Sequence, residues 1–338
     1  MTIEKIKSQS TWRFNREAFR KSVDTHCAHA LKQFKKIVHS HLFLHLSLLS
    51  LLAVEACAFL LCLVFLFTPS LIATLLAAFL LTAFGYLILI FYSQTKKPEQ
   101  LIQLRNWFIL LCKQGIPSQI DASDYHLLLA NAAYSFTSYL SHHQQHFYTL
   151  RPSPRSFKKL TQTFVHLCHR RDIHKIKELF IMVSINEHIQ LIKKNPTHVE
   201  AHASLANAYV ALSHLYRPQN GQSTPKDFTE KAKAATAKAI QEFEIINHYS
   251  PNDPWVYAQL ASCYHDISFY DKEIEAYEAI LKLCPNDKEI LFRLGILYFQ
   301  QGFNAQGLQI YEKLKTLNFS RTEELIDFYG FSAHDASS

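Results

Sequence analysis

Glycine is scarce in this chain, with only seven residues among 338. Phosphate-binding loops and dinucleotide-binding turns need closely spaced glycines, because the backbone must approach the phosphates. The sequence has no such loop, and it also contains no nucleophile elbow, HExxH helix or CxxC pair. We therefore expect no catalytic residues and no cofactor, and the chain is not predicted to be an enzyme.

Cysteine provides no structural framework either. The seven cysteines are scattered along the chain rather than grouped in pairs. Cys263 and Cys284 stand at positions suited to small apolar packing. This pattern is typical of reduced thiols in a cytosolic compartment, and it does not predict a disulfide scaffold.

Charge is nearly absent from two long stretches near the N-terminus. Leu42–Thr68 and Leu71–Tyr92 are largely apolar, and only Pro69-Ser70 separates them. Each is long enough for the ~20 residues that a helix needs to cross a bilayer. Buried helices of a soluble core are the weaker interpretation for two adjacent spans. A cleaved signal peptide is not expected, because roughly forty mostly polar and basic residues precede the first span.

Basic residues flank this predicted hairpin on both sides. The segments before Leu42 and after Tyr92 carry an excess of Lys and Arg, whereas the turn carries no charge. Positive residues stay on the cytoplasmic side of a membrane, so both termini are expected there. The lipid bilayer is therefore a predicted partner. From Asp121 onward the chain is slightly acidic, so nucleic acid is not.

The segment before the hairpin contains an amphipathic pattern. Between Arg16 and Ser40, apolar residues recur at helical spacing with Lys and Arg between them. Such a helix can lie on the membrane surface. It can equally pack against a helix predicted at Pro98–Lys113, just after the second span. The residues alone leave both alternatives open.

One acid interrupts the first span. Glu55 falls near the middle, where an ionised carboxylate is costly and a functional relay is the first hypothesis to consider. No second acid, Lys or Arg lies in either span. We therefore expect a protonated Glu55 that is hydrogen-bonded to Thr82 or Tyr86, near its level on the returning helix.

The C-terminal part repeats with a period of about 34 residues. Pro251-Asn252-Asp253 recurs as Pro285-Asn286-Asp287, and Leu260-Ala261 recurs as Leu294-Gly295. A small residue beside a Leu lets two antiparallel helices approach closely, and aromatic residues at matched positions fill the remaining space. The matched pairs are Tyr264 with Tyr298 and Tyr277 with Tyr311.

These residues resemble the tetratricopeptide repeat (TPR) family, with two good copies at 254–285 and 288–319. One departure is Glu273, which stands where the family has a small residue, although Gly307 obeys in the second copy. A third, stretched copy precedes them, with Leu205 and Tyr209 in its first helix and Phe243 in its second. Ser320–Glu323 has the form of a capping box, and it predicts a closing helix that covers the last repeat.

The expected fold class is all-α, with an N-terminal transmembrane helical hairpin followed by a TPR-like α-solenoid. The domain organisation that we predict is 1–41, a basic amphipathic segment; 42–92, the transmembrane hairpin; 93–121, a juxtamembrane helix and linker; and 122–338, the TPR-like repeat domain.

The resemblance implies that a protein or peptide ligand binds the concave face, lined by the first helix of each repeat. Some family members grip a C-terminal carboxylate with a clamp of Lys, Asn and Arg. Asn207 and Arg293 occupy clamp-like positions here, but Ala203 and Glu289 replace the lysines and Gln259 replaces an Asn, so the clamp is incomplete. The predicted partner-binding residues are Asn207, Trp255, Gln259, His265, Phe292, Arg293 and Phe299, although the aromatic ones can also pack between repeats.

Histidine is abundant, with 19 residues, and several lie at i, i+4 spacing. His142 with His146 and His198 with His202 are the clearest pairs. Neither has an evident third ligand, so we interpret them as surface or half-buried residues and predict no metal site.

Two functions fit these patterns. The first is a membrane-anchored TPR adaptor or scaffold that mediates protein–protein interactions on the cytoplasmic face of a bacterial inner membrane. The second is a secreted effector that presents its repeats to host proteins. The hydrophobic hairpin resembles the inclusion-membrane proteins of obligate intracellular bacteria, which implies a host inclusion membrane as its location.

Overall fold

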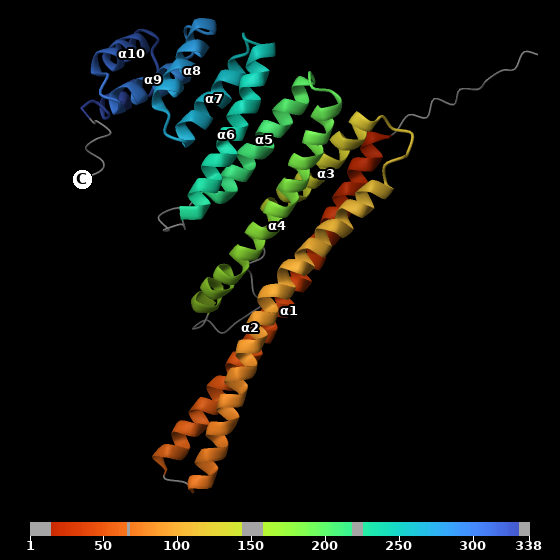
Figure 1. Ribbon diagram of the computed structural model, residues 1–338. Helices are drawn as coiled ribbons and strands as arrows, with labels where there is room; N and C mark the ends of the chain where they lie inside the picture. The colour runs from red at the N-terminus through yellow and green to blue at the C-terminus, as the bar shows by residue number, and fades with distance from the viewer. Residues whose placement is uncertain (1–14, 66–67, 144–157, 218–225, 331–338) are drawn as a thin grey trace, which may run out of the picture. The chain divides into compact units, whose positions relative to one another are not determined.

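The computed structural model describes residues 15–65, 68–143, 158–217 and 226–330, and the side chains of these residues except 158–169 and 226–227. Its described elements are all helices (Figure 1). The chain divides into two compact units, residues 1–184 and 185–338. Each unit is described by itself below.

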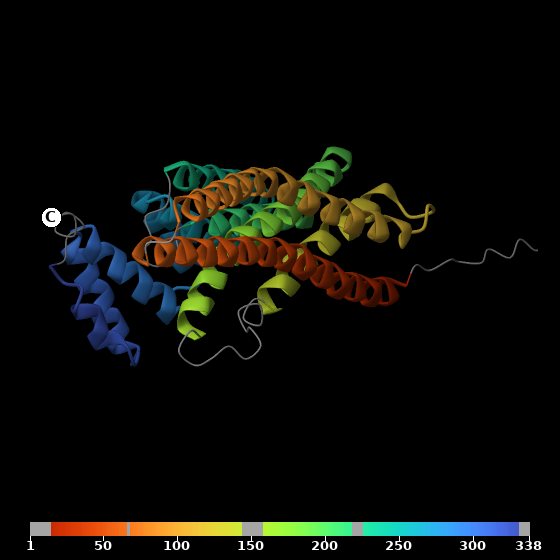
Figure 2. The same cartoon turned by 90° about the horizontal axis from the view of Figure 1, so that it is seen from below.

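Two long helices dominate the first unit. α1 (Arg16–Val64) and α2 (Pro69–Gln114) run antiparallel and lie side by side in both views (Figures 1 and 2). The Asn15 side chain caps the start of α1 by accepting from the Ala18 N–H, and Pro69 occupies the first turn of α2, where its missing N–H costs nothing. Each helix contains an 18-residue window with a mean hydropathy of 2.4, of which nothing is buried. By length and composition, each is able to cross a bilayer.

Both helices continue beyond the apolar windows. α1 includes the basic segment as well as the first span, and α2 includes the second span as well as the helix predicted at Pro98–Lys113. The apolar face of the basic segment includes Phe19, Val23 and Phe34. These side chains are buried in a core that they share with Leu104 and Phe108 of α2. Of the two alternatives for this segment, the structure therefore shows packing against α2, because α2 already covers the face that a membrane surface would need.

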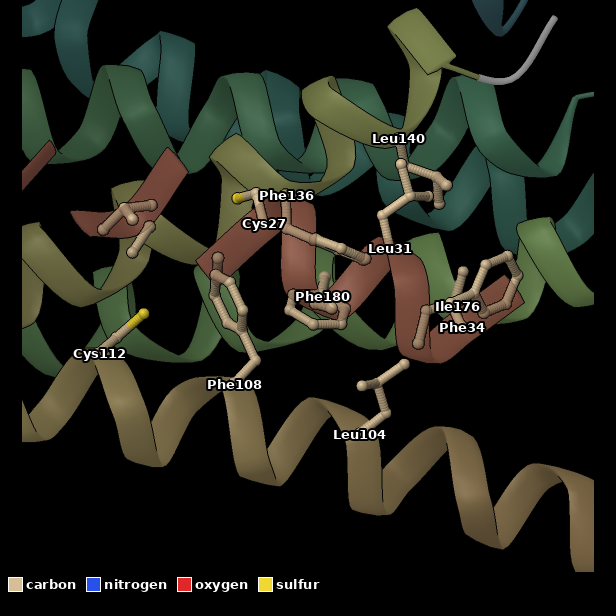
Figure 3. Packing of buried hydrophobic residues seen from close by; sticks show 14 of the residues in the cluster. Cys27, Leu31, Phe34, Leu104, Phe108, Cys112, Phe136, Leu140, Ile176 and Phe180 are labelled. Atoms are coloured by element: carbon tan, nitrogen blue, oxygen red, sulfur yellow. The ribbon is translucent and has the colours of Figure 1, made fainter. Parts of the chain in front are cut away.

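Two further helices complete this core. Side chains of α3 (Ala122–His143) and of residues 173–180 in α4 (Lys158–Lys194) pack against residues 19–38 of α1 and 101–112 of α2 (Figure 3). Phe108, Phe136 and Phe180 come from three different helices and meet with ring centroids 4.2 to 5.6 Å apart. We expected a repeat domain to begin at residue 122. That boundary stays a prediction, and the structure adds that α3 and α4 contribute Phe136, Ile176 and Phe180 to a core shared with the hairpin.

A polar network lies above this core, where the apolar spans begin. His41 is buried between the helices, and its Nε2 donates to Gln100 Oε1 at 2.9 Å. Its Nδ1 is then left to accept from the Ser93 hydroxyl at 3.1 Å. Lys97 pairs with buried Asp172 of α4. Burial raises the pKa of Asp172 despite the neighbouring Lys97 ammonium. The pair joins α4 to the hairpin, and the cost is the desolvation of the buried carboxylate.

Glu55 has the partner expected from the sequence. The hydroxyl of Thr82 lies 2.9 Å from Glu55 Oε1, and the same hydroxyl lies 2.9 Å from the Ala78 carbonyl oxygen. Thr82 donates to Glu55 Oε1, and the second carboxyl oxygen, Oε2, is buried without a hydrogen-bond partner. The hydrogen bond is thus confirmed, and the protonation of Glu55 stays a prediction.

The second unit consists of antiparallel helix pairs, in the manner of TPR repeats (Figure 1). The pair that corresponds to the stretched copy is longer than the others, with 18 and 24 residues against 13 or 14. Both good copies appear with the predicted register, because Leu260, Ala261, Leu294 and Gly295 are all buried. The helices are α5 (Val199–Tyr216), α6 (Lys226–Tyr249), α7 (Pro254–Asp266), α8 (Tyr270–Leu283), α9 (Lys288–Gln300) and α10 (Asn304–Thr316).

The closing helix exists but begins differently from the prediction. α11 (Thr322–Ile326) is short, and the residue at its N-cap is Arg321, which makes no side-chain cap. The predicted capping box needs Ser320 at the N-cap, and it is wrong because Arg321 occupies that position. The covering role is nevertheless confirmed. Leu325 is fully buried, and a Cβ added at Gly295 would lie 2.9 Å from it.

Cysteines follow the sequence interpretation except at one position. Six cysteines have described side chains and all are free. Burial raises the pKa values of Cys27, Cys112 and Cys263 to about 12, so these thiols stay protonated and unreactive. Cys284 is exposed rather than packed, since it forms the C-cap of α8 where the helix ends.

The turn between the helices of a repeat adopts the left-handed conformation in both good copies. Ser268 has φ of 62° and Gly302, its counterpart, has φ of 78°. In each turn the following N–H bonds back to a Tyr carbonyl, Phe269 to Tyr264 at 2.9 Å and Phe303 to Tyr298 at 2.8 Å.

Ser268→Gly should therefore stabilise the repeat, because a side chain at positive φ costs roughly 1 kcal/mol that glycine does not. We expect slower hydrogen exchange of the α7 and α8 amides in the full chain, with Ser262→Gly, in the middle of α7, showing the opposite effect. Equal exchange for Ser268→Gly and the wild type would contradict this account.

Candidate partner-binding face

A repeated hydrogen bond holds the first helices of the two good repeats in register. Tyr264 of α7 donates to Glu244 of α6 at 3.2 Å, and Tyr298 of α9 donates to Glu278 of α8 at 2.7 Å. Burial and the neighbouring carboxylate raise the pKa of Tyr264 to about 12, so its hydroxyl remains a donor. Each bond joins the first helix of one repeat to the second helix of the repeat before it.

A cation lies over the tyrosine ring in two successive repeats. Lys238 lies 5.6 Å from the ring centroid of Tyr209, and Lys272 lies 5.5 Å from that of Tyr264. Tyr264 therefore has both contacts, a hydrogen bond from its hydroxyl to Glu244 and the Lys272 ammonium over its ring. Their positions differ by one repeat, so the same alignment would have revealed them in the sequence.

The seven predicted partner-binding residues divide by exposure. Asn207, Trp255, His265 and Arg293 are exposed, and Gln259 is partly exposed. Trp255 retains 43 % of its surface and also makes an edge contact with Phe243, at 5.9 Å between ring centroids. The side chain of Arg293 lies beside the hydroxyl of Tyr277. These five residues are able to meet a partner without any change in the packing of the repeats.

Phe292 and Phe299 are buried, and their prediction as groove residues is wrong. Phe292 is 2 % exposed, packs against Phe319 and lies 4.3 Å below the guanidinium of Arg321. Phe299 is completely buried, and its ring occupies the space above Gly307. Both aromatic side chains fill the gap between α9 and its neighbours, so neither reaches the surface.

The departure from the family at Glu273 has a compensating partner. Glu273 is 4 % exposed and its Oε2 lies 3.0 Å from His265 Nδ1. One repeat later, the same two positions hold Gly307 and Phe299, and a Cβ on Gly307 would lie 2.4 Å from the Phe299 ring. In the second good repeat, the large Phe299 ring thus packs against Gly307. In the first, the smaller imidazole of His265 contacts the carboxylate of Glu273. Burial still raises the pKa of Glu273, which the His265 contact opposes.

A charged group lies at the C-terminal end of α7. Asp266 accepts from Arg217, which follows α5, and lies 3.7 Å from His214. Burial by itself would raise the pKa of Asp266, but the His214 and Arg217 contacts lower it below its ordinary value. This group ties α5 to α7 and places the imidazole of His214 at the surface.

Of the predicted histidine pairs, His142 is exposed and His198 half-buried as expected, whereas His202 is buried. His198 caps α5 by accepting from the Ala201 N–H at 3.1 Å, and His202 contacts Glu242 at 2.6 Å and the Pro196 carbonyl at 2.9 Å. His146 lies outside the described residues. Among the residues that the structure describes, no three His, Cys, Asp or Glu side chains converge on a metal-sized site.

Comparisons with known proteins add little to this geometry. No protein-family model matches the chain, and none of the curated proteins matches it. Among solved structures, MamA MSR-1 C2 is similar over 67 % of this chain and 95 % of its own, with 13 % identity and a TM-score of 0.37. MamA RS-1 ArsTM double mutant is similar over 60 % and 97 %, with 12 % identity and a TM-score of 0.33. At such scores neither likeness decides the fold, which rests on the helix pairs themselves.

Proposed function

We propose that this protein is a membrane-anchored adaptor that holds a protein or peptide on its TPR-type helix pairs at the cytoplasmic face. One observation carries the proposal. The packing positions of the repeats are occupied by the chain's own side chains, while Asn207, Gln259 and Arg293 on the first helices stay accessible. Solenoids of this kind supply a binding surface and no chemistry of their own.

The accessible set favours a particular kind of ligand. Asn207 and Gln259 each offer an amide that both donates and accepts, which suits the backbone of an extended segment. Arg293 supplies a cation for an acidic group on the ligand. Trp255 provides an aromatic surface of the type that dominates interface energy. That these side chains face one groove follows from the alignment of equivalent helices and stays a prediction.

Replacing Arg293 and Trp255 with Ala should weaken partner capture by about 2 kcal/mol or more, since a few anchors carry most binding energy. The measurement is a crosslinking pulldown from expressing cells with the tag after Ser338, followed by quantification of the captured protein. The matched control replaces Lys282 and Gln306, exposed residues on the second helices α8 and α10. Equal loss in the control, or none in the double variant, would move the binding surface away from the first helices.

Topology provides an independent check on the anchor. Both termini should stay in the cytoplasm, because Lys and Arg flank the hairpin on both sides and its turn is uncharged. A reporter that is active only outside the cytoplasm, fused after Ser338, should be silent, and the same reporter inserted after Pro69 should be active. Strong activity at Ser338 would exclude this orientation.

A second candidate function is a secreted effector anchored in a host inclusion membrane. The uncharged hairpin with both ends on one side favours it, because that pattern is shared with the inclusion-membrane proteins noted above. Fractionation of infected cells decides between the candidates. The chain should be found in bacterial membranes if it is an adaptor and in inclusion membranes if it is an effector.

A further inference from the structure

We propose that the hairpin inserts into a preformed bilayer from the side on which both termini remain, without moving any charged residue across. The proposal rests on the membrane anchoring proposed above and adds the route by which the anchor is reached. It follows from three features of the hairpin: the composition of its turn, the hydrogen bonding of its turn, and the hydrogen bond that its single acid makes with the opposite helix.

The turn contains no charged side chain, and therefore none that is strongly hydrated. The segment that must cross is Phe65–Ser70, in which Thr68 and Ser70 are the only polar side chains. Moving Lys, Arg or Asp through the hydrocarbon is the main obstacle to crossing a membrane. Here that obstacle is absent, because the nearest Lys or Arg on either side is Lys36 or Lys96.

The backbone of the turn meets part of its own hydrogen-bonding need. Phe65 N–H bonds to the Leu61 carbonyl at 3.1 Å, and the Thr68 carbonyl accepts from Leu71 at 3.0 Å and from Ile72 at 3.3 Å. Pro69 has no N–H to satisfy. The Ser70 hydroxyl lies 3.4 Å from that of Thr68. Unsatisfied backbone groups are the second obstacle in hydrocarbon, and these bonds reduce their number among the described residues that flank the turn.

The Glu55 carboxyl group enters the bilayer together with its hydrogen-bond partner. Glu55 is the only Asp, Glu, Lys or Arg between Lys36 and Lys96, and its side chain is hydrogen-bonded to Thr82 of the opposite helix. The Thr82 hydroxyl supplies one carboxyl oxygen of Glu55 with a hydrogen bond inside the hydrocarbon, where an unpaired polar atom is costly. Because this bond exists only when α1 and α2 are side by side, the hairpin enters as a closed unit rather than one helix at a time.

The length of the hairpin matches this route. Leu42–Val64 of α1 is about 34 Å long at 1.5 Å per residue, slightly more than the hydrocarbon thickness of about 30 Å. Glu55 then lies near the midplane, and the turn lies at the far surface. The polar network of His41, Ser93 and Gln100 lies where the apolar part ends, on the side from which the hairpin enters.

The test is insertion of the full chain after its synthesis is complete. The protein is made by cell-free translation without membranes, ribosomes are removed, and vesicles of phosphatidylcholine with phosphatidylglycerol are added. Inserted protein should resist alkaline extraction, and protease added outside should leave a protected fragment containing the hairpin. Thr68→Lys with Ser70→Lys should reduce insertion by about tenfold or more, because both charges must cross.

The matched control carries the same two charges on the near side. Gln94→Lys with Thr95→Lys alters two exposed residues that do not cross, so its insertion should equal that of the wild type. The proposal is overturned if the turn variant inserts as well as the control, or if the wild type remains extractable from vesicles. If the wild type is also extractable from the membranes of a bacterial host that produces it, the anchoring itself is wrong. If it is integral there, only the unassisted route fails.

Discussion

Gly307→Glu should destabilise the last repeat by more than about 3 kcal/mol, and adding Phe299→His should restore a substantial part of the loss. The single substitution places a side chain where even a Cβ would lie 2.4 Å from the Phe299 ring, and it sets a carboxylate against that apolar ring. The double variant recreates the His265–Glu273 contact of the preceding repeat, in which the Glu273 oxygen lies 3.0 Å from the imidazole.

The size of the recovery measures how far the two positions act together. We expect the double variant to be about 1–3 kcal/mol more stable than the sum of the single effects, since residues in contact do not behave additively. Hydrogen exchange of the α9 and α10 amides in the full chain in detergent reports the stability of this repeat. The control is Gln306→Glu, which adds the same charge at an exposed position on the same helix and should change stability by less than about 0.5 kcal/mol. If the two effects simply add, the residues at positions 299 and 307 do not act together.

Acid should weaken the second unit by about 3 kcal/mol between pH 6.5 and pH 4 through a single side chain, His188 of α4. His188 is 2 % exposed, its Nδ1 has no hydrogen-bond partner, and burial lowers its pKa from 6.5 to about 4. Between these two values the unfolded chain binds the proton and the folded chain does not. Lowering the pH therefore favours unfolding, and the full stability is present only above pH 6.5.

The prediction is tested by a difference, because another group acts in the opposite sense. Burial raises the pKa of Glu273, so its protonation in acid favours the folded state. The pKa of Asp266 is lowered in the folded state, so its protonation in acid favours unfolding, as that of His188 does. His188→Gln removes the His188 titration and leaves the other two. The most protected amides of α5 to α9 should lose stability toward pH 4 in the wild type and markedly less in the variant. Equal pH dependence in the two proteins would show that His188 is not the group responsible.

Much of the architecture was accessible from the sequence because it repeats locally. A period of about 34 residues, with prolines and acids at the same points, determines where helices begin. Asp253 and Asp287 accept from backbone N–H groups in the first turns of α7 and α9, as caps do. The contact between Glu55 and Thr82 was also accessible, since counting residues back from a two-residue turn gives the level on the returning helix.

The tertiary structure decided which surface covers each apolar face. Periodicity shows that a helix has an apolar side, but the same side suits a membrane, a neighbouring helix or a partner. For this reason the sequence left two alternatives for residues 16–40, and packing with Leu104 and Phe108 selected one of them. The same limit holds for α3, since only the structure shows that its Phe136 packs with Phe108 of the hairpin.

The candidate binding face shows this division most clearly. The sequence identified the first helices as the source of the exposed residues, and Asn207, Trp255, His265 and Arg293 are exposed. It did not separate them from Phe292 and Phe299, because exposure depends on the size of the residue opposite. Gly307 leaves room that only the Phe299 ring fills, whereas Glu273 occupies that room in the preceding repeat and His265 remains at the surface. Which aromatic residue faces solvent is thus a property of pairs that lie apart in the chain, and it becomes visible only when the helices are packed.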